Sequence, residues 1–134
     1  MVDSPDWITD VQVTVIVENT PVPSTPAHET AIIELDRLVT DDMEYDTVVS
    51  WTVTAARIGV LRFVEFETDD YDLTRFQLTI AGVVQFTDIQ VEQTLTLELP
   101  DVKLAAGAVV LLEAKSSDGT EVTVDGDIIG KEIG

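Results

Sequence analysis

Alternation of apolar and polar residues is the feature that most narrows what this chain can fold into. Val, Ile and Thr together supply 47 of its 134 residues, and branched side chains at that density favour strands over helices. In several runs an apolar residue stands at every second position, as in a strand with one buried face. The clearest sets are Val11, Val13, Val15 and Val17; Val49, Trp51 and Val53; Phe76, Leu78 and Ile80; and Leu95, Leu97 and Leu99. We therefore predict antiparallel sheets with one buried and one solvated face.

Dipeptides typical of turns lie between these runs. Asp118-Gly119 separates two strand-like runs and predicts a tight hairpin. Pro100-Asp101, Ala106-Gly107 and Asp125-Gly126 predict further turns. Around Thr87-Asp88 the alternation slips by one residue, which predicts a bulge or a short corner.

About eight to ten short strands in a chain of this length predict an all-β fold, either a two-sheet sandwich or a barrel. We expect an antiparallel, jelly-roll-like sandwich. Ala31 to Val39 fits either a short amphipathic helix or a strand. We favour the strand because the neighbouring segments are strands.

The first 30 residues stand apart from the rest. We predict that residues 1–30 form an N-terminal strand or arm with a Pro-rich link, and that residues 31–134 form the β-sandwich domain. The link, Thr20 to Thr30, holds three prolines and must be irregular or extended. The arm would dock on its own body or on a neighbour. Trp7 would correspondingly pack onto the sandwich or anchor on another subunit, whereas Trp51 is expected in the core.

The charge of the chain is extreme. Twenty-six Asp and Glu face seven Lys and Arg, giving a formal net charge of -19, far beyond the magnitude of roughly 2–8 usual for a small domain. Such charges repel one another in dilute buffer, but at molar salt the Debye length falls to about 3 Å and screens them. We favour a protein made for concentrated salt over a generic acidic protein or a nucleic-acid mimic. Nucleic-acid binding is not expected because no basic patch exists to neutralise phosphates.

The sequence offers little for catalysis. It has no Cys, so thiolate chemistry and disulfides are excluded. Its one histidine, His28, lies in the Pro-rich link, where a bystander role is expected. Glu65 and Glu67 share one face of a predicted strand, about 7 Å apart, a spacing that would suit a glycosidase. With only two Trp and two Tyr to line a sugar groove, we favour a solvated face and predict that the protein is not an enzyme.

Two acidic clusters are candidates for cations. Asp69, Asp70 and Asp72 crowd one predicted loop beside Tyr71, and hard oxygen ligands on turns are what Ca²⁺ takes. The second cluster, at the predicted hairpin ends, consists of Asp118, Asp125 and Asp127. Neither matches an EF-hand loop. We favour diffuse binding of Na⁺, K⁺ or Mg²⁺, keep Asp69, Asp70 and Asp72 as a candidate Ca²⁺ or Mg²⁺ site, and predict no other cofactor.

Membrane and export signals are not expected from the sequence. The first residues lack the basic region and apolar run of a signal peptide. Nowhere do about 18 consecutive apolar residues occur, as a membrane-spanning helix requires. We therefore expect synthesis in the cytoplasm and no membrane partner.

The segments Trp51 to Phe66, Phe76 to Gly82, Ala114 to Thr120 and Asp125 to Ile133 resemble the β-sandwich accessory proteins of tailed-virus particles. In those proteins a strand leads through a small-residue turn into a long hydrophobic strand, and a hairpin near the end completes the sandwich. Together with the acidity, the resemblance implies a virion protein of a virus that infects a halophilic archaeon. Such proteins decorate capsids or form turrets, spikes or tail parts. They usually act as trimers or pentamers and carry no active site.

Three functions follow as hypotheses. The first is a structural virion component, made in the host cytoplasm, that assembles with itself and with other virion proteins. The second is a module that binds carbohydrate or a cell-surface receptor on the same sandwich. The third is a small hydrolase, for which Glu65 and Glu67 or the Asp69 to Asp72 loop would have to converge in a cleft.

Overall fold

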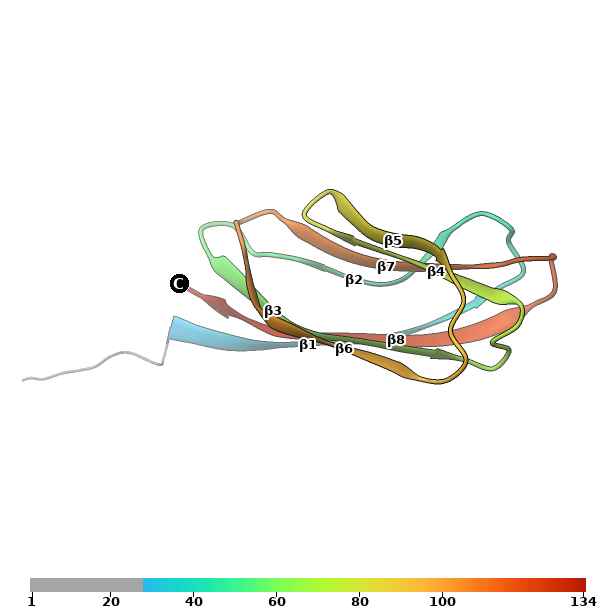
Figure 1. The fold of residues 1–134 in the computed structure, drawn as a ribbon. Coiled ribbons are helices and arrows are strands. Elements are labelled where there is room, and N and C mark those ends of the chain that lie inside the picture. The colour runs from blue at the N-terminus through green and yellow to red at the C-terminus, as the bar shows by residue number, and fades with distance from the viewer. Residues whose placement is uncertain (1–27) are drawn as a thin grey trace, which may run out of the picture.

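A computed structural model describes residues 28–134, which form two packed sheets (Figure 1). Both sheets have four antiparallel strands, in the orders β1-β8-β3-β6 and β2-β7-β4-β5. These orders are those of a jelly roll, so the predicted all-β, antiparallel two-sheet sandwich is confirmed. The strands are β1 (Glu29–Thr40), β2 (Asp46–Thr52), β3 (Ile58–Thr68), β4 (Thr74–Ile80), β5 (Val83–Ile89), β6 (Leu95–Leu104), β7 (Val109–Ser116) and β8 (Val122–Ile133).

The ambiguous segment 31–39 is a strand, as favoured. It lies within β1, which pairs with β8 along its whole length, from Glu29 opposite Ile133 to Thr40 opposite Val122. The sandwich therefore begins two residues before the predicted boundary at residue 31. Residues 1–27 lie outside the described part of the chain, and with them the run Val11–Val17, Trp7 and most of the Pro-rich link.

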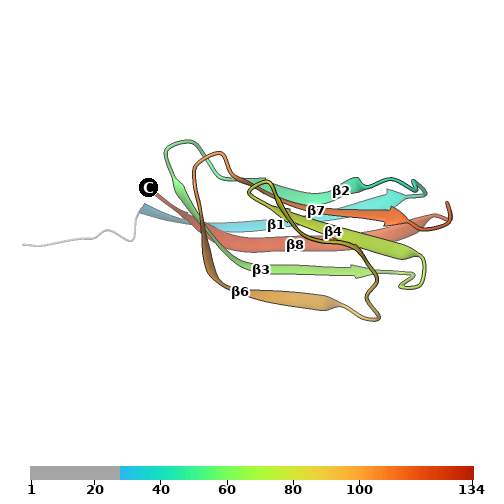
Figure 2. The same ribbon diagram turned by 45° about the horizontal axis from the view of Figure 1, so that its top comes forward.

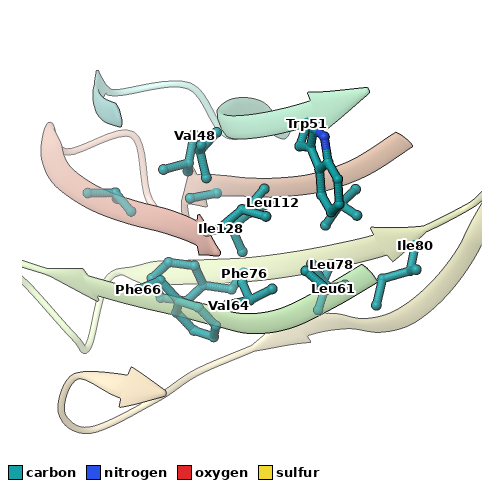
Figure 3. Close-up of a cluster of buried hydrophobic side chains, with 14 of the residues drawn as sticks. Val48, Trp51, Leu61, Val64, Phe66, Phe76, Leu78, Ile80, Leu112 and Ile128 are labelled. Carbon is teal, nitrogen blue, oxygen red and sulfur yellow. The ribbon is translucent and has the colours of Figure 1, made fainter. Parts of the chain in front are cut away.

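The core forms where the apolar faces of the two sheets meet (Figure 3). The rings of Phe66 in β3 and Phe76 in β4 join the sheets, with centroids 4.4 Å apart. Trp51 is buried in the same cluster, as predicted. Burying each large apolar side chain stabilises the fold by about 1.5–3 kcal/mol, so the period-2 pattern of the sequence is also its main source of stability.

Some of the predicted turns and bulges are present in the structure and others are not. The bulge at Thr87-Asp88 is confirmed, because Phe76 lies opposite Ile89 while Leu78 lies opposite Phe86. Ala106-Gly107 is a turn between β6 and β7, as predicted. The hairpin predicted at Asp118-Gly119 is wrong: this loop connects β7 to β8, which lie in different sheets.

Two other predicted turns lie inside strands. Pro100-Asp101 falls within β6 and Asp125-Gly126 within β8. Close packing requires glycine at position 126, because a β-carbon there would lie 2.7 Å from Leu112 Cδ2 and 2.9 Å from Val48 Cγ1. Gly130, also in β8, faces the backbone carbonyl of Val60 in the same way. The glycines let this central strand approach its neighbours closely.

The eight strands run alternately in opposite directions, so successive loops lie at opposite ends of the sandwich. The loops β2–β3, β4–β5 and β6–β7 share one end with residues 28–29 and the last residues of β8 (Figure 1). The loops β1–β2, β3–β4, β5–β6 and β7–β8 share the other. Figure 2 shows β1, β8, β3 and β6 side by side, with β1 and β6 at the two edges of their sheet.

None of the described residues forms a helix long and apolar enough to cross a membrane.

The close packing of β8 can be tested with a double-mutant cycle. Gly126→Ala should lower the free energy of unfolding by about 1–3 kcal/mol through overpacking, and Val48→Ala should recover part of that loss by making room. Gly130→Ala should lower the free energy of unfolding by a similar amount. Val48→Ala should not recover that loss, because the new β-carbon at position 130 would meet the backbone carbonyl of Val60 rather than a side chain. Urea unfolding in molar NaCl measures all variants. Equal non-additivity in the two cycles would contradict this packing.

Candidate assembly surface

The two ends of the sandwich differ sharply in charge. The loops of one end, residues 41–45, 69–73, 90–94 and 117–121, contain no Lys or Arg. Their acidic residues are Asp41, Asp42, Glu44, Asp69, Asp70, Asp72, Glu92, Asp118 and Glu121. The loops of the opposite end, residues 53–57, 81–82 and 105–108, contain no acidic residue and one cation, Arg57. We call these the acidic end and the acid-free end.

The strand segments that adjoin the acid-free loops carry few carboxylates, and those carboxylates are neutralised. Each of the three lies within 4 Å of a cation. The pairs are Lys131–Glu29 (3.2 Å), Arg62–Asp101 (3.3 Å) and Arg57–Glu132 (3.6 Å). A second acidic molecule can therefore approach this end with less charge repulsion than it meets at any of the acidic loops.

The acid-free end also exposes apolar surface. Val83 is 62% exposed and Val84 53% exposed at the start of β5, and Ile58 is exposed at the start of β3. An open hollow of about 520 Å³ lies between the β4–β5 turn and the β6–β7 loop, lined by residues from 79–82 and 105–111 that carry no charge. Exposed apolar side chains beside an uncharged hollow are surface of the kind that proteins bury when they bind one another.

A buried carboxylate fixes the shape of the acid-free end. Glu132 is 2% exposed; its Oε2 accepts hydrogen bonds from the Trp51 indole N–H (2.9 Å) and the Thr54 backbone N–H (3.0 Å). Burial by itself would raise the pKa of Glu132, but these hydrogen bonds and the Arg57 guanidinium outweigh burial and hold the pKa below its ordinary value. The carboxylate thereby ties the β2–β3 loop to β8 and to the core.

Glu132 should give the fold a defined pH dependence. Because its folded pKa is lowered, its contribution is present above the unfolded pKa of about 4.3 and is lost as pH falls through the folded value. Glu132→Gln should cost about 2–3 kcal/mol at pH 7, since it removes a charged acceptor from buried donors. That difference from wild type should shrink toward pH 3. Exposed Glu98→Gln, which removes the same charge, should change stability by less than about 0.5 kcal/mol; a Glu132 effect independent of pH would contradict this role.

The outer face of the β1-β8-β3-β6 sheet holds a second candidate site, an acidic groove of about 570 Å³. Register places Glu65 opposite Asp127 and Glu67 opposite Asp125. Arg37 Nε donates to Asp125 at 2.7 Å and lowers its pKa, whereas burial and the charge of Glu65 raise the pKa of Asp127. The Glu65–Glu67 pair thus lies on an outward strand face, as expected. Among the described residues that line this groove, Phe66 is the only aromatic one, and it is buried in the core.

The predicted cation ligands Asp69, Asp70 and Asp72 lie in the β3–β4 loop, but their carboxylates engage different partners. Asp69 accepts from the Thr123 backbone N–H, and Asp70 accepts from backbone N–H groups of its own loop. Within residues 28–134, no three His, Cys, Asp or Glu side chains are grouped to hold a metal ion. The Ca²⁺ or Mg²⁺ site stays a prediction.

The second predicted cluster is dispersed. Asp118 caps its own loop by accepting from the Thr120 backbone N–H, which lowers its pKa. Asp125 and Asp127 lie within β8 and face the acidic groove. His28 precedes β1, and its carbonyl accepts from the Gly134 backbone N–H. The structure therefore does not bring Asp118 together with the other two aspartates.

The charge difference between the two ends was not predicted from the sequence, although the loop sequences contain a signal for it. In a chain whose strands alternate in direction, every second loop lies at the same end. Loops 41–45 and 69–73 are acidic, whereas the intervening loop 53–57 and the next one, 81–82, contain no acid. Comparing alternate loops would have revealed the segregation.

Neither a protein-family model nor a curated protein sequence matches this chain.

Proposed function

We propose that this protein is a structural subunit of a virion that works in concentrated salt, as a capsid-decoration, turret, spike or tail component. Its function is assembly, with copies of itself and with other virion proteins. The observation that carries the proposal is the acid-free end. On a chain of net charge -19, loops without carboxylates gather at one end, next to exposed Val83 and Val84.

Salt is part of the proposed mechanism. When two copies meet, the repulsion between their remaining carboxylates opposes contact, and it falls as the Debye length shortens to about 3 Å at 1 M. Apolar burial at the acid-free end is not weakened by simple screening. Association should therefore strengthen with NaCl, the opposite of an interface built on ion pairs.

A carbohydrate-binding role has less support. Sugar sites usually combine polar groups with an aromatic surface against which the ring packs. The acidic groove supplies carboxylates, but its aromatic lining residue is buried. The assembly role, in contrast, uses surface that is exposed and has no other evident purpose.

If the protein functions by assembly, its association into an oligomer should strengthen with salt and weaken when charge is added to the acid-free end. Sedimentation velocity in 3 M NaCl should show a homo-oligomer that dissociates as NaCl is lowered toward 0.1 M. Ala106→Glu, which puts a carboxylate on the acid-free end, should weaken association in 3 M NaCl by at least about tenfold, because it would be buried without a partner.

Gln93→Glu is the matched control, since it adds the same charge to an exposed position in a loop of the acidic end. It should leave association within about twofold of wild type. A protein that is monomeric at every salt concentration and binds no virion component would disprove the proposed function.

A further inference from the structure

One long side of the sandwich is incompletely closed. β1 contacts β2 across the two sheets, but no comparable contact joins β5 to β6 on the opposite side. Inward-facing residues there are only half-buried, unlike Leu61 and Leu112, which are fully buried. The half-buried apolar residues of this side are Phe86, Val91, Leu95, Leu97, Leu99 and Val102.

The strand β5 at this opening is an edge strand suited to receive another strand. It is the last strand of its sheet, so one side of its backbone has no strand partner among the described residues. Its residues Val83, Val84 and Ile89 are exposed, and its only charge is Asp88. Exposed, apolar edge strands are the usual acceptors of β-strand addition.

The edge of β1 is protected by comparison. Its outward residues Ile33 and Leu35 are exposed and apolar, but Glu34 and Asp36 alternate with them and are also exposed. The side chains of Glu34 and Asp36 point toward the partner sheet, because Leu35 and Arg37 lie on the outer face with Asp127 and Asp125. Inward-pointing charges on an edge strand oppose pairing with another chain. Of these two long sides of the sandwich, the one formed by β5 and β6 is therefore the acceptor.

The chain itself contains a segment that fits this edge. Residues 11–17, Val-Gln-Val-Thr-Val-Ile-Val, lie outside the described part and match the seven-residue length of β5 without a single charge. As a strand, the segment would place Val11, Val13, Val15 and Val17 on one face. That face could cover the half-buried leucines of β6.

The composition of the link favours the β5 of a neighbour over the chain's own β5. The chain enters β1 at the acid-free end, and β5 starts at the same end. To reach its own β5, the chain would have to turn back across this end within residues 18–28, whose three prolines favour an extended conformation. When two copies face each other through their acid-free ends, the segment instead continues straight into the neighbour and runs antiparallel to its β5. Eleven extended residues can span up to about 35 Å, and prolines favour such extension.

We propose that residues 11–17 of one copy add to β5 of a second copy as an antiparallel strand, closing the opening between β5 and β6. This inference rests on the proposed assembly function and identifies its partner as a second copy of this chain. The exchange would tie subunits together across their acid-free ends, which is a low-cost route to oligomers.

Disulfide trapping tests the proposal directly, because the native chain has no cysteine. Val13→Cys, Val15→Cys and Val17→Cys, which scan the register, would each be mixed with Val84→Cys in 3 M NaCl under mild oxidation. Opposed residues of paired strands lie about 4.5–5.5 Å apart, within the range of a disulfide. At least one mixture should give a covalent dimer of the two different variants. Thr47→Cys, exposed on the opposite edge of the same sheet, is the control and should give no such dimer.

The outcomes separate the inference from the proposed function. An oligomer that forms normally but gives no disulfide with Val84→Cys overturns the strand exchange and leaves the assembly function standing. A disulfide that forms only within single chains of Val15→Cys/Val84→Cys also overturns the exchange. Absence of any oligomer overturns both.

A pair of charge variants tests the same contact without cross-linking. Val13→Asp/Val15→Asp should weaken the oligomer by at least about tenfold, because two carboxylates would face the apolar opening. Gln12→Asp/Thr14→Asp adds the same charge to the other face of the segment and should have a several-fold smaller effect. Equal effects would contradict the proposed orientation.

Discussion

Repulsion among carboxylates is the constraint on which this structure depends. With 26 acidic and seven basic residues, the chain can fold only if its charges remain in solvent or are paired. The fold meets this requirement by placing nine carboxylates in the four loops of one end. Where a carboxylate is buried, as at Glu132, hydrogen bonds and Arg57 compensate it. The opposite end is then the place where two such molecules can come together.

The sequence predicts the strands well because their cause is local. Alternation of Phe76, Leu78 and Ile80 suffices to predict β4, and a slip in the same alternation locates the bulge at Thr87-Asp88. It does not predict which strands pair. Asp118-Gly119 has the local signature of a hairpin, yet it crosses between sheets because β8 pairs with β1 and β3. Gly126 likewise resembles a turn residue but is required by the contacts of β8 with Val48 and Leu112.

The candidate surface was less predictable because it is assembled from distant segments. The β4–β5 turn and the β6–β7 loop form the apolar hollow only after β7 has paired with β4. The predicted cation ligands Asp69, Asp70 and Asp72 are adjacent in sequence, but backbone donors in the folded loop already engage Asp69 and Asp70. Adjacent carboxylates in a strongly acidic chain are therefore poor guides to a site, whereas the places without carboxylates are informative.

Amide hydrogen exchange, compared between dilute monomer and concentrated oligomer in the same molar NaCl, tests the central claim most directly. If the acid-free end is the assembly surface, exchange should slow at residues 81–84 and 105–109 on assembly. It should stay unchanged in loops 41–45, 69–73 and 117–121. Protection of the acidic loops, with none at 81–84 and 105–109, would contradict the account.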